Sequence, residues 1–272
     1  MRLLAVAAGS TAAAVAVLYF WQKRRPRKPL KADGYEECFV NRDAAFVPID
    51  ASLGAGFSVL LIHRLASPEE CEDLRAQASQ VAASANKLAA TDPRRPLWSV
   101  PEAPGRLRLP LEKAFGAGAR SLVDKLLLRA IGTLRDSVAP TLLPALFGDR
   151  LDATTTTTMI DHPGLCWSPR EPAINVYSSR GRFKPHKDHE LMTVLVPLNE
   201  GFEGGGTAFW SSDSNASPAG SEPSLVLRPP AGTAIVFAGC MTHAAVAVVA
   251  GERCCVVASF SPADEADRQE EG

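Results

Sequence analysis

The stretch KPHKDHELMTVLVPLN, residues 184–199, places two of the chain's five histidines on either side of an aspartate, just before an apolar run. On a strand, residues i and i+2 face the same side, so His186 and Asp188 can direct an imidazole and a carboxylate at one point. His243 begins a later apolar run and can supply a third ligand. Two histidines and one carboxylate hold non-haem Fe(II) and leave positions open for oxygen chemistry. The same set also binds catalytic zinc, which keeps a zinc-dependent hydrolase as an alternative.

Arg253 lies ten residues beyond His243 and is preceded by Gly251. A strand, a turn and a returning strand would bring its guanidinium into the mouth of the same barrel, where it can grip a carboxylate through two hydrogen bonds. An iron site beside a buried arginine suits 2-oxoglutarate, because one end of that molecule chelates a metal and the other end is a free carboxylate. We therefore expect Arg253 to bind this co-substrate.

The pattern of the chain changes at residue 153. From there on, short β-branched or apolar runs, beginning with ATTTTTMI, alternate with Gly, Pro, Ser and Asp clusters, which is typical of an all-β sandwich or barrel. Upstream, one helix is predicted from Ser67, where Glu70 completes a capping box, and another over 119–146 with a break at Pro140. The segment 159–172, with Trp167, is expected at the rim of the barrel.

The N-terminus differs from the rest. Residues 3–21 carry no charge, close to the roughly 20 residues that a helix needs to cross a bilayer, and the basic stretch KRRPRK follows. This predicts a single transmembrane helix in the endoplasmic reticulum or another endomembrane, with the rest of the chain in the cytosol by charge bias. A lumenal placement and a cleaved organelle transit peptide are the alternatives.

Together these patterns predict an α+β protein: a double-stranded β-helix, or jelly roll, flanked by N-terminal helices and preceded by one transmembrane helix. The expected parts are a membrane anchor with a basic flank (1–32), a largely helical supporting segment (33–152), the jelly-roll domain (153–262) and an acidic tail (263–272). The net charge of −1 provides no positive field for nucleic acid, which is not expected as a partner. Six cysteines without a C-x-x-C pair indicate that most of them are buried thiols.

Several ordered motifs around these residues resemble one family. Tyr177 precedes His186 by nine residues, with Gly181, Phe183 and Pro185 between them. The segments PLNEGFEGGGTAFW and PPAGTAIVF follow, and His243 and Arg253 close the series. Over residues 56–262 the chain is similar to the prolyl 4-hydroxylase alpha-subunit-like family of Fe(II)/2-oxoglutarate-dependent dioxygenases.

The resemblance implies an oxidoreductase in which His186, Asp188 and His243 bind Fe(II), and Arg253 and Tyr177 bind 2-oxoglutarate. The co-substrates would be 2-oxoglutarate and O2, and the resemblance also allows ascorbate. The implied reaction hydroxylates a C–H bond in a protein or peptide side chain such as proline and releases succinate and CO2. A small-molecule substrate and a non-catalytic jelly-roll interaction module stay as alternatives.

Overall fold

The structure is a computed structural model. The residues that it describes are 44–48, 58–91, 105–138, 142–152, 156–188, 190–210 and 222–263. The expected membrane span at 3–21 and all but the first residue of the expected acidic tail lie outside these ranges. Within the described ranges, no helix is both long enough and apolar enough to cross a bilayer.

Eight strands in two antiparallel sheets form a jelly roll, with the chain crossing from one sheet to the other after most of them. They are β5 (Ala173–Tyr177), β6 (Phe183–His186), β7 (Met192–Pro197), β9 (Thr207–Phe209), β10 (Leu225–Leu227), β11 (Ala234–Ala238), β12 (His243–Ala245) and β14 (Arg253–Pro262). In the larger sheet the order is β11-β7-β14-β5, and in the smaller sheet it is β10-β9-β12-β6. This crossing of consecutive strands from one sheet to the other confirms the predicted double-stranded β-helix.

Further strands extend the larger sheet at both edges. On one side β2 (Ser58–Ile62) pairs with β11, and β1 (Ala44–Pro48) pairs with β2. On the other side β3 (Arg106–Pro110) pairs with β5, while β4 (Leu165–Trp167) pairs with the end of β14. The short strands β8 (Glu203–Gly204) and β13 (Val248–Ala250) form a separate ladder. The supporting segment therefore adds strands to the barrel's own sheet, which the sequence did not predict.

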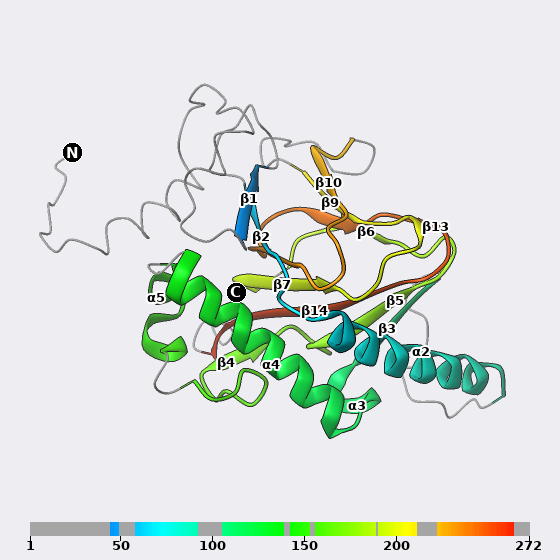
Figure 1. The fold of residues 1–272 in the computed structure, drawn as a ribbon, viewed down its shortest axis with the longest axis horizontal. Coiled ribbons are helices and arrows are strands. Elements are labelled where there is room, and N and C mark those ends of the chain that lie inside the picture. The colour runs from blue at the N-terminus through cyan, green and yellow to red at the C-terminus, as the bar shows by residue number, and fades with distance from the viewer. Residues whose placement is uncertain are drawn as a thin grey trace, which may run out of the picture.

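Helices cover the face of the larger sheet that points away from the smaller one, so the protein has three layers (Figure 1). The Ser67 amide donates to Glu70 and the Glu70 amide donates to the Ser67 hydroxyl, which confirms the predicted capping box. The second predicted helix is confirmed as α4, which continues into the π-helical turn η5, and as α5, while the expected break at Pro140 lies outside the described residues. The helices are α2 (Pro68–Thr91), α3 (Leu111–Ala114), α4 (Ala117–Thr133), η5 (Leu134–Val138), α5 (Leu142–Phe147) and η6 (Gly148–Leu151).

The expected strand at 153–160 is not formed in its described part, residues 156–160. The Asp124 carboxylate on α4 accepts hydrogen bonds from the Met159 and Ile160 amides, both at 2.8 Å, and from the Thr158 hydroxyl at 3.0 Å. Because one carboxylate satisfies these donors, the segment needs no neighbouring strand. The prediction from the β-branched run was therefore wrong here, since β propensity gave way to a contact with a helix distant in sequence.

Candidate metal centre

His186 and His243 lie directly opposite each other on the paired strands β6 and β12. Their ring centroids are 4.2 Å apart. The Asp188 carboxylate lies 3.5 Å from Nε2 of His186 and 3.6 Å from Nε2 of His243. The ligand atoms of all three residues lie within 4.8 Å of one another. The structure therefore brings together the three residues that the sequence proposed as a metal-binding set.

Backbone carbonyls fix the orientation of both imidazoles. Nδ1 of His186 lies 3.0 Å from the carbonyl of Lys184, and Nδ1 of His243 lies 3.0 Å from the carbonyl of Met241. A carbonyl only accepts, so Nδ1 carries a proton in each ring, and Nε2 is the atom that faces Asp188 and can bind a metal. This is the tautomer that a metal ligand requires.

Two further contacts hold the Asp188 carboxylate in place. The Asp188 amide donates to the carbonyl of Gly239 at 2.9 Å, and a Cβ at Gly239 would lie 2.0 Å from the carbonyl of Glu190. Only glycine therefore permits this approach of the two segments. The Thr193 hydroxyl donates to Asp188 Oδ2 at 2.6 Å and is itself hydrogen bonded to Ser259 at 3.1 Å.

The ionisation of these groups suits a cation site. Burial alone would raise the pKa of Asp188, but the neighbouring His186 and His243 imidazoles and the Thr193 hydroxyl lower it below its usual value. Burial lowers the pKa of His243, an effect that Asp188 opposes. The carboxylate is therefore ionised and the His243 imidazole neutral near neutral pH.

The donor set fits a divalent metal. Ligand atoms that each lie about 2.1 Å from one ion are about 3.0 Å apart at right angles and about 3.4 Å apart at a tetrahedral angle. The separations of 3.5 and 3.6 Å from the Asp188 oxygens to the two Nε2 atoms are close to this range. The two Nε2 atoms and the carboxylate are directed at one another, and a cation between them would bind all three.

Arg253 and Tyr177 occupy one cross-strand position of β14 and β5, with the guanidinium carbon 5.4 Å from the centre of the phenol ring. Both residues line the cavity that contains the metal-ligand set, and Arg253 is only 2% exposed. The Arg253 guanidinium donates to the Thr207 hydroxyl at 3.0 Å. The structure thus places the two sequence-predicted co-substrate residues in the same cavity as the metal ligands.

Five polar residues that sequence reasoning missed also line this cavity: Arg106, Arg108, Glu171, Asn175 and Thr207. Arg108 forms a buried ion pair with Glu171, whose carboxylate also accepts the Ser259 amide. Burial raises the pKa of Glu171, although Arg108 opposes the shift. The alternation in RLRLP at residues 106–110 was the available signal, since period-2 arginines among leucines indicate a strand with one polar face.

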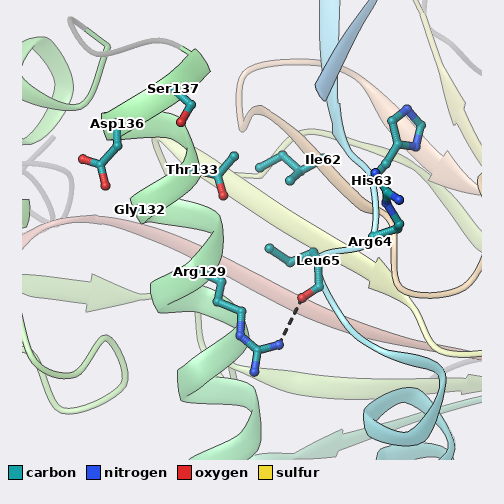
Figure 2. A pocket seen from close by; sticks show the side chains of 9 residues that line it. All are labelled: Ile62, His63, Arg64, Leu65, Arg129, Gly132, Thr133, Asp136 and Ser137. Atoms are coloured by element: carbon teal, nitrogen blue, oxygen red, sulfur yellow. Dashed lines mark hydrogen bonds between the residues drawn. The ribbon is translucent and has the colours of Figure 1, made fainter. Parts of the chain in front are cut away.

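The predicted rim segment 159–172 contributes to the cavity through one residue. Glu171 lines it, whereas Trp167 packs with its ring centroid 5.1 Å from that of Phe260 in the core. A larger surface depression lies elsewhere, between the turn after β2 and the helices α4 and η5 (Figure 2). His63 and Arg129 line this depression, and Arg129 donates to the carbonyl of Leu65 across it. It shares no lining residue with the metal-ligand cavity.

No protein-family model and no curated protein matches the chain. Among solved structures, the chain is similar to the viral collagen prolyl hydroxylase of Paramecium bursaria Chlorella virus-1 in its 2-oxoglutarate complex, at 15% identity, 75% coverage of this chain, 95% coverage of that chain and a TM-score of 0.44. It is similar to a Pseudomonas putida prolyl-4-hydroxylase at 15% identity, with 75% and 92% coverage and a TM-score of 0.42. It is also similar to HygX from Streptomyces hygroscopicus, with nickel and 2-oxoglutarate bound, at 14% identity, 75% and 83% coverage and a TM-score of 0.45. At identities this low the likeness concerns the fold alone.

Proposed function

We propose that the chain is an Fe(II)- and 2-oxoglutarate-dependent dioxygenase that hydroxylates a C–H bond, with a protein or peptide side chain such as proline as its substrate. The observation that carries the proposal is the convergence of His186, Asp188 and His243 in a cavity that also contains the buried Arg253. When bound, Fe(II) and 2-oxoglutarate supply the oxidation of an unactivated C–H bond by O2, with release of succinate and CO2.

The chain's own residues bind and orient the reactants. The metal ligands are the two Nε2 atoms and the Asp188 carboxylate. Arg253 binds the distal carboxylate of 2-oxoglutarate, with the Thr207 hydroxyl beside its guanidinium and the Tyr177 ring next to it. Leu195 and Val257 form part of the apolar lining of the cavity, which lowers the local dielectric and strengthens these ionic contacts.

A zinc-dependent hydrolase would use the same ligands but needs a general base beside them. Besides Asp188, the only carboxylic acid among the described lining residues is Glu171. Arg108 engages one of its oxygens and the Ser259 amide engages the other, so this carboxylate is poorly placed to take a proton from water. Hydrolysis at this metal would also require no buried arginine such as Arg253. An intact ligand set argues against a module that has lost catalysis.

The test combines metal analysis of the purified protein with assays of succinate release. We expect the protein to bind Fe(II) and to release succinate in the presence of 2-oxoglutarate and O2. Release should rise with the correct substrate among proline-containing peptides, amino acids, amines and lipids. Succinate release no higher than in the metal-free control, together with hydrolytic activity of the zinc-loaded protein, would replace the oxygenase with the hydrolase.

We further propose that residues 3–21 anchor the protein in an endomembrane, with the supporting segment and the jelly roll on the cytosolic side. The uncharged span and the basic residues after it support this arrangement. Asn215-Ala216-Ser217 is a glycosylation sequon, and it reports the side of the membrane because only lumenal sequons receive glycan. We expect no glycan at Asn215 in cells, and a shift in mobility on glycosidase treatment would contradict the cytosolic placement.

A further inference from the structure

Strand β3 places two arginines in the wall of the cavity. Arg106 and Arg108 are two residues apart and lie opposite Tyr177 and Asn175 of β5, so all four side chains project to the same face of the sheet. All four line the cavity that contains the metal-ligand set, and Arg106 is 2% exposed. Arg108 is paired with Glu171, so the lining keeps an excess of positive charge beyond this pair, which favours the binding of an anion.

Arg106 lies within reach of a molecule bound at the metal. Its guanidinium carbon lies 3.9 Å from the centroid of the Phe183 ring. The edge of that ring meets the His186 imidazole, with the two ring centroids 4.5 Å apart. One phenyl ring thus separates the Arg106 charge from a metal-ligating imidazole. A small molecule can contact Arg106 at one end and present a C–H bond to the metal at the other.

Two polar atoms beside Arg106 have no hydrogen-bond partner within the part of the chain that the structure describes. They are the Nε donor of Arg108 and the Oδ1 acceptor of Asn175. Asn175 is only 4% exposed, and the two residues face each other across β3 and β5. Buried polar groups are costly without a partner. A ligand that presents an acceptor to Arg108 and a donor to Asn175 would satisfy both.

The charge of the lining points to an anion. The described lining residues include three guanidinium groups and two carboxylates, an excess of one positive charge while both histidines are neutral. Fe(II) and the 2-oxoglutarate dianion cancel each other, so the excess persists when both are bound. A carboxylate group of the substrate would pair with this excess charge, which favours an acid in a site of low dielectric.

We propose, on the basis of the function proposed above, that Arg106 binds a carboxylate of the substrate that is hydroxylated. The Nε donor of Arg108 shares this carboxylate, and the Asn175 oxygen accepts a hydrogen bond from an N–H or O–H group beside it. The substrate is therefore a carboxylic acid with a neighbouring hydrogen-bond donor. The acid is either a free amino or hydroxy acid, or the C-terminus or acidic side chain of a peptide.

The experiment measures binding of matched acids and amides to the protein loaded with Ni(II) and N-oxalylglycine. The probes are L-proline and L-prolinamide, a proline-terminated tripeptide as acid and as amide, and an internal-proline peptide with Asp or Asn beside the proline. The thermal unfolding midpoint reports binding, and succinate release with Fe(II) and 2-oxoglutarate reports turnover. We expect at least one acid to raise the midpoint and to stimulate turnover at least about tenfold more than its amide. Which acid does so identifies the source of the carboxylate.

Arg106→Gln should abolish this discrimination and raise the KM for the acid at least about tenfold, while the KM for 2-oxoglutarate changes little. Arg106→Lys keeps the charge and should retain part of the preference, which separates lost recognition from misfolding. Arg182→Gln, an exposed arginine beside Phe183, is the control and should behave as wild type.

Three results would overturn the inference. In the first, no acid in the panel exceeds its amide. In the second, Arg106→Gln leaves the preference for the acid intact. In the third, Arg106→Gln raises the 2-oxoglutarate requirement as Arg253→Ala does, which would make Arg106 a co-substrate anchor. Failure of the oxygenase assignment looks different: Ni(II) and N-oxalylglycine would then produce no rise in the unfolding midpoint before any probe is added.

Discussion

Asp188→Ala is expected to abolish Fe(II) binding and 2-oxoglutarate turnover while the protein stays folded. Asp188 supplies the only negative charge among the three ligands. Without it, only two imidazoles remain to bind the Fe(II) dication. Loss of a residue that only hydrogen bonds to a metal ligand already lowers metal affinity or activity about 10- to 100-fold. Loss of the ligating carboxylate itself should therefore lower Fe(II) affinity further. Metal content after gel filtration, succinate release and the cooperativity of thermal unfolding are the three measurements.

A graded control separates loss of the ligand from damage to its surroundings. Thr193→Val removes the hydroxyl that donates to Asp188 but leaves all three ligands, so we expect Fe(II) affinity to fall about 10- to 100-fold without being lost. Thr233→Val alters a buried threonine at the start of β11 that does not line the cavity, and should leave Fe(II) affinity unchanged. Asp188→Ala protein that still decarboxylates 2-oxoglutarate in an Fe(II)-dependent manner would contradict the metal assignment.

The metal-ligand set could be predicted because local geometry fixes most of it. The relative orientation of His186 and Asp188 was predicted from the alternation of side chains along an extended chain. In the structure the two side chains lie close together, although Asp188 lies two residues past the end of β6. His243 and Arg253 each begin a strand, and their separation of ten residues covers one short crossing from the smaller sheet to the larger. The capping box at Ser67 is likewise a local signal.

The contribution of β3 could not be predicted in the same way. Arg106 pairs across strands with Tyr177, 71 positions later in the chain, and no local pattern specifies which strand a five-residue segment joins. Gly105 and Gly181 make the junction possible, because a Cβ at Gly181 would lie 2.1 Å from the carbonyl of Gly105. The prediction of a strand at residues 156–160 was wrong for a related reason. The Asp124 carboxylate that accepts the backbone hydrogen bonds of this segment is distant in sequence.

Arg253→Ala is expected to raise the 2-oxoglutarate requirement steeply and to leave Fe(II) binding intact. Arg253 is 2% exposed, and its guanidinium would be the charged partner of the co-substrate's distal carboxylate in a site from which water is largely excluded. Removal of one member of a buried ion pair costs about 3–5 kcal/mol, because the remaining charge loses its partner without regaining water. The KM for 2-oxoglutarate should therefore rise by roughly 100- to 4000-fold, as measured by succinate release over a wide co-substrate range.

Arg253→Lys distinguishes the charge of this anchor from its shape. A lysine keeps the positive charge but not the two-pronged donor geometry, so we expect an intermediate rise in KM of about tenfold. The rise should be specific to 2-oxoglutarate, because no metal ligand contacts Arg253 and its described hydrogen bond goes to Thr207. An unchanged requirement in Arg253→Ala, with Fe(II) binding intact, would move the anchor to another cation of the cavity. Arg106 lies across β5 from Arg253, opposite the same tyrosine, and would be the first candidate.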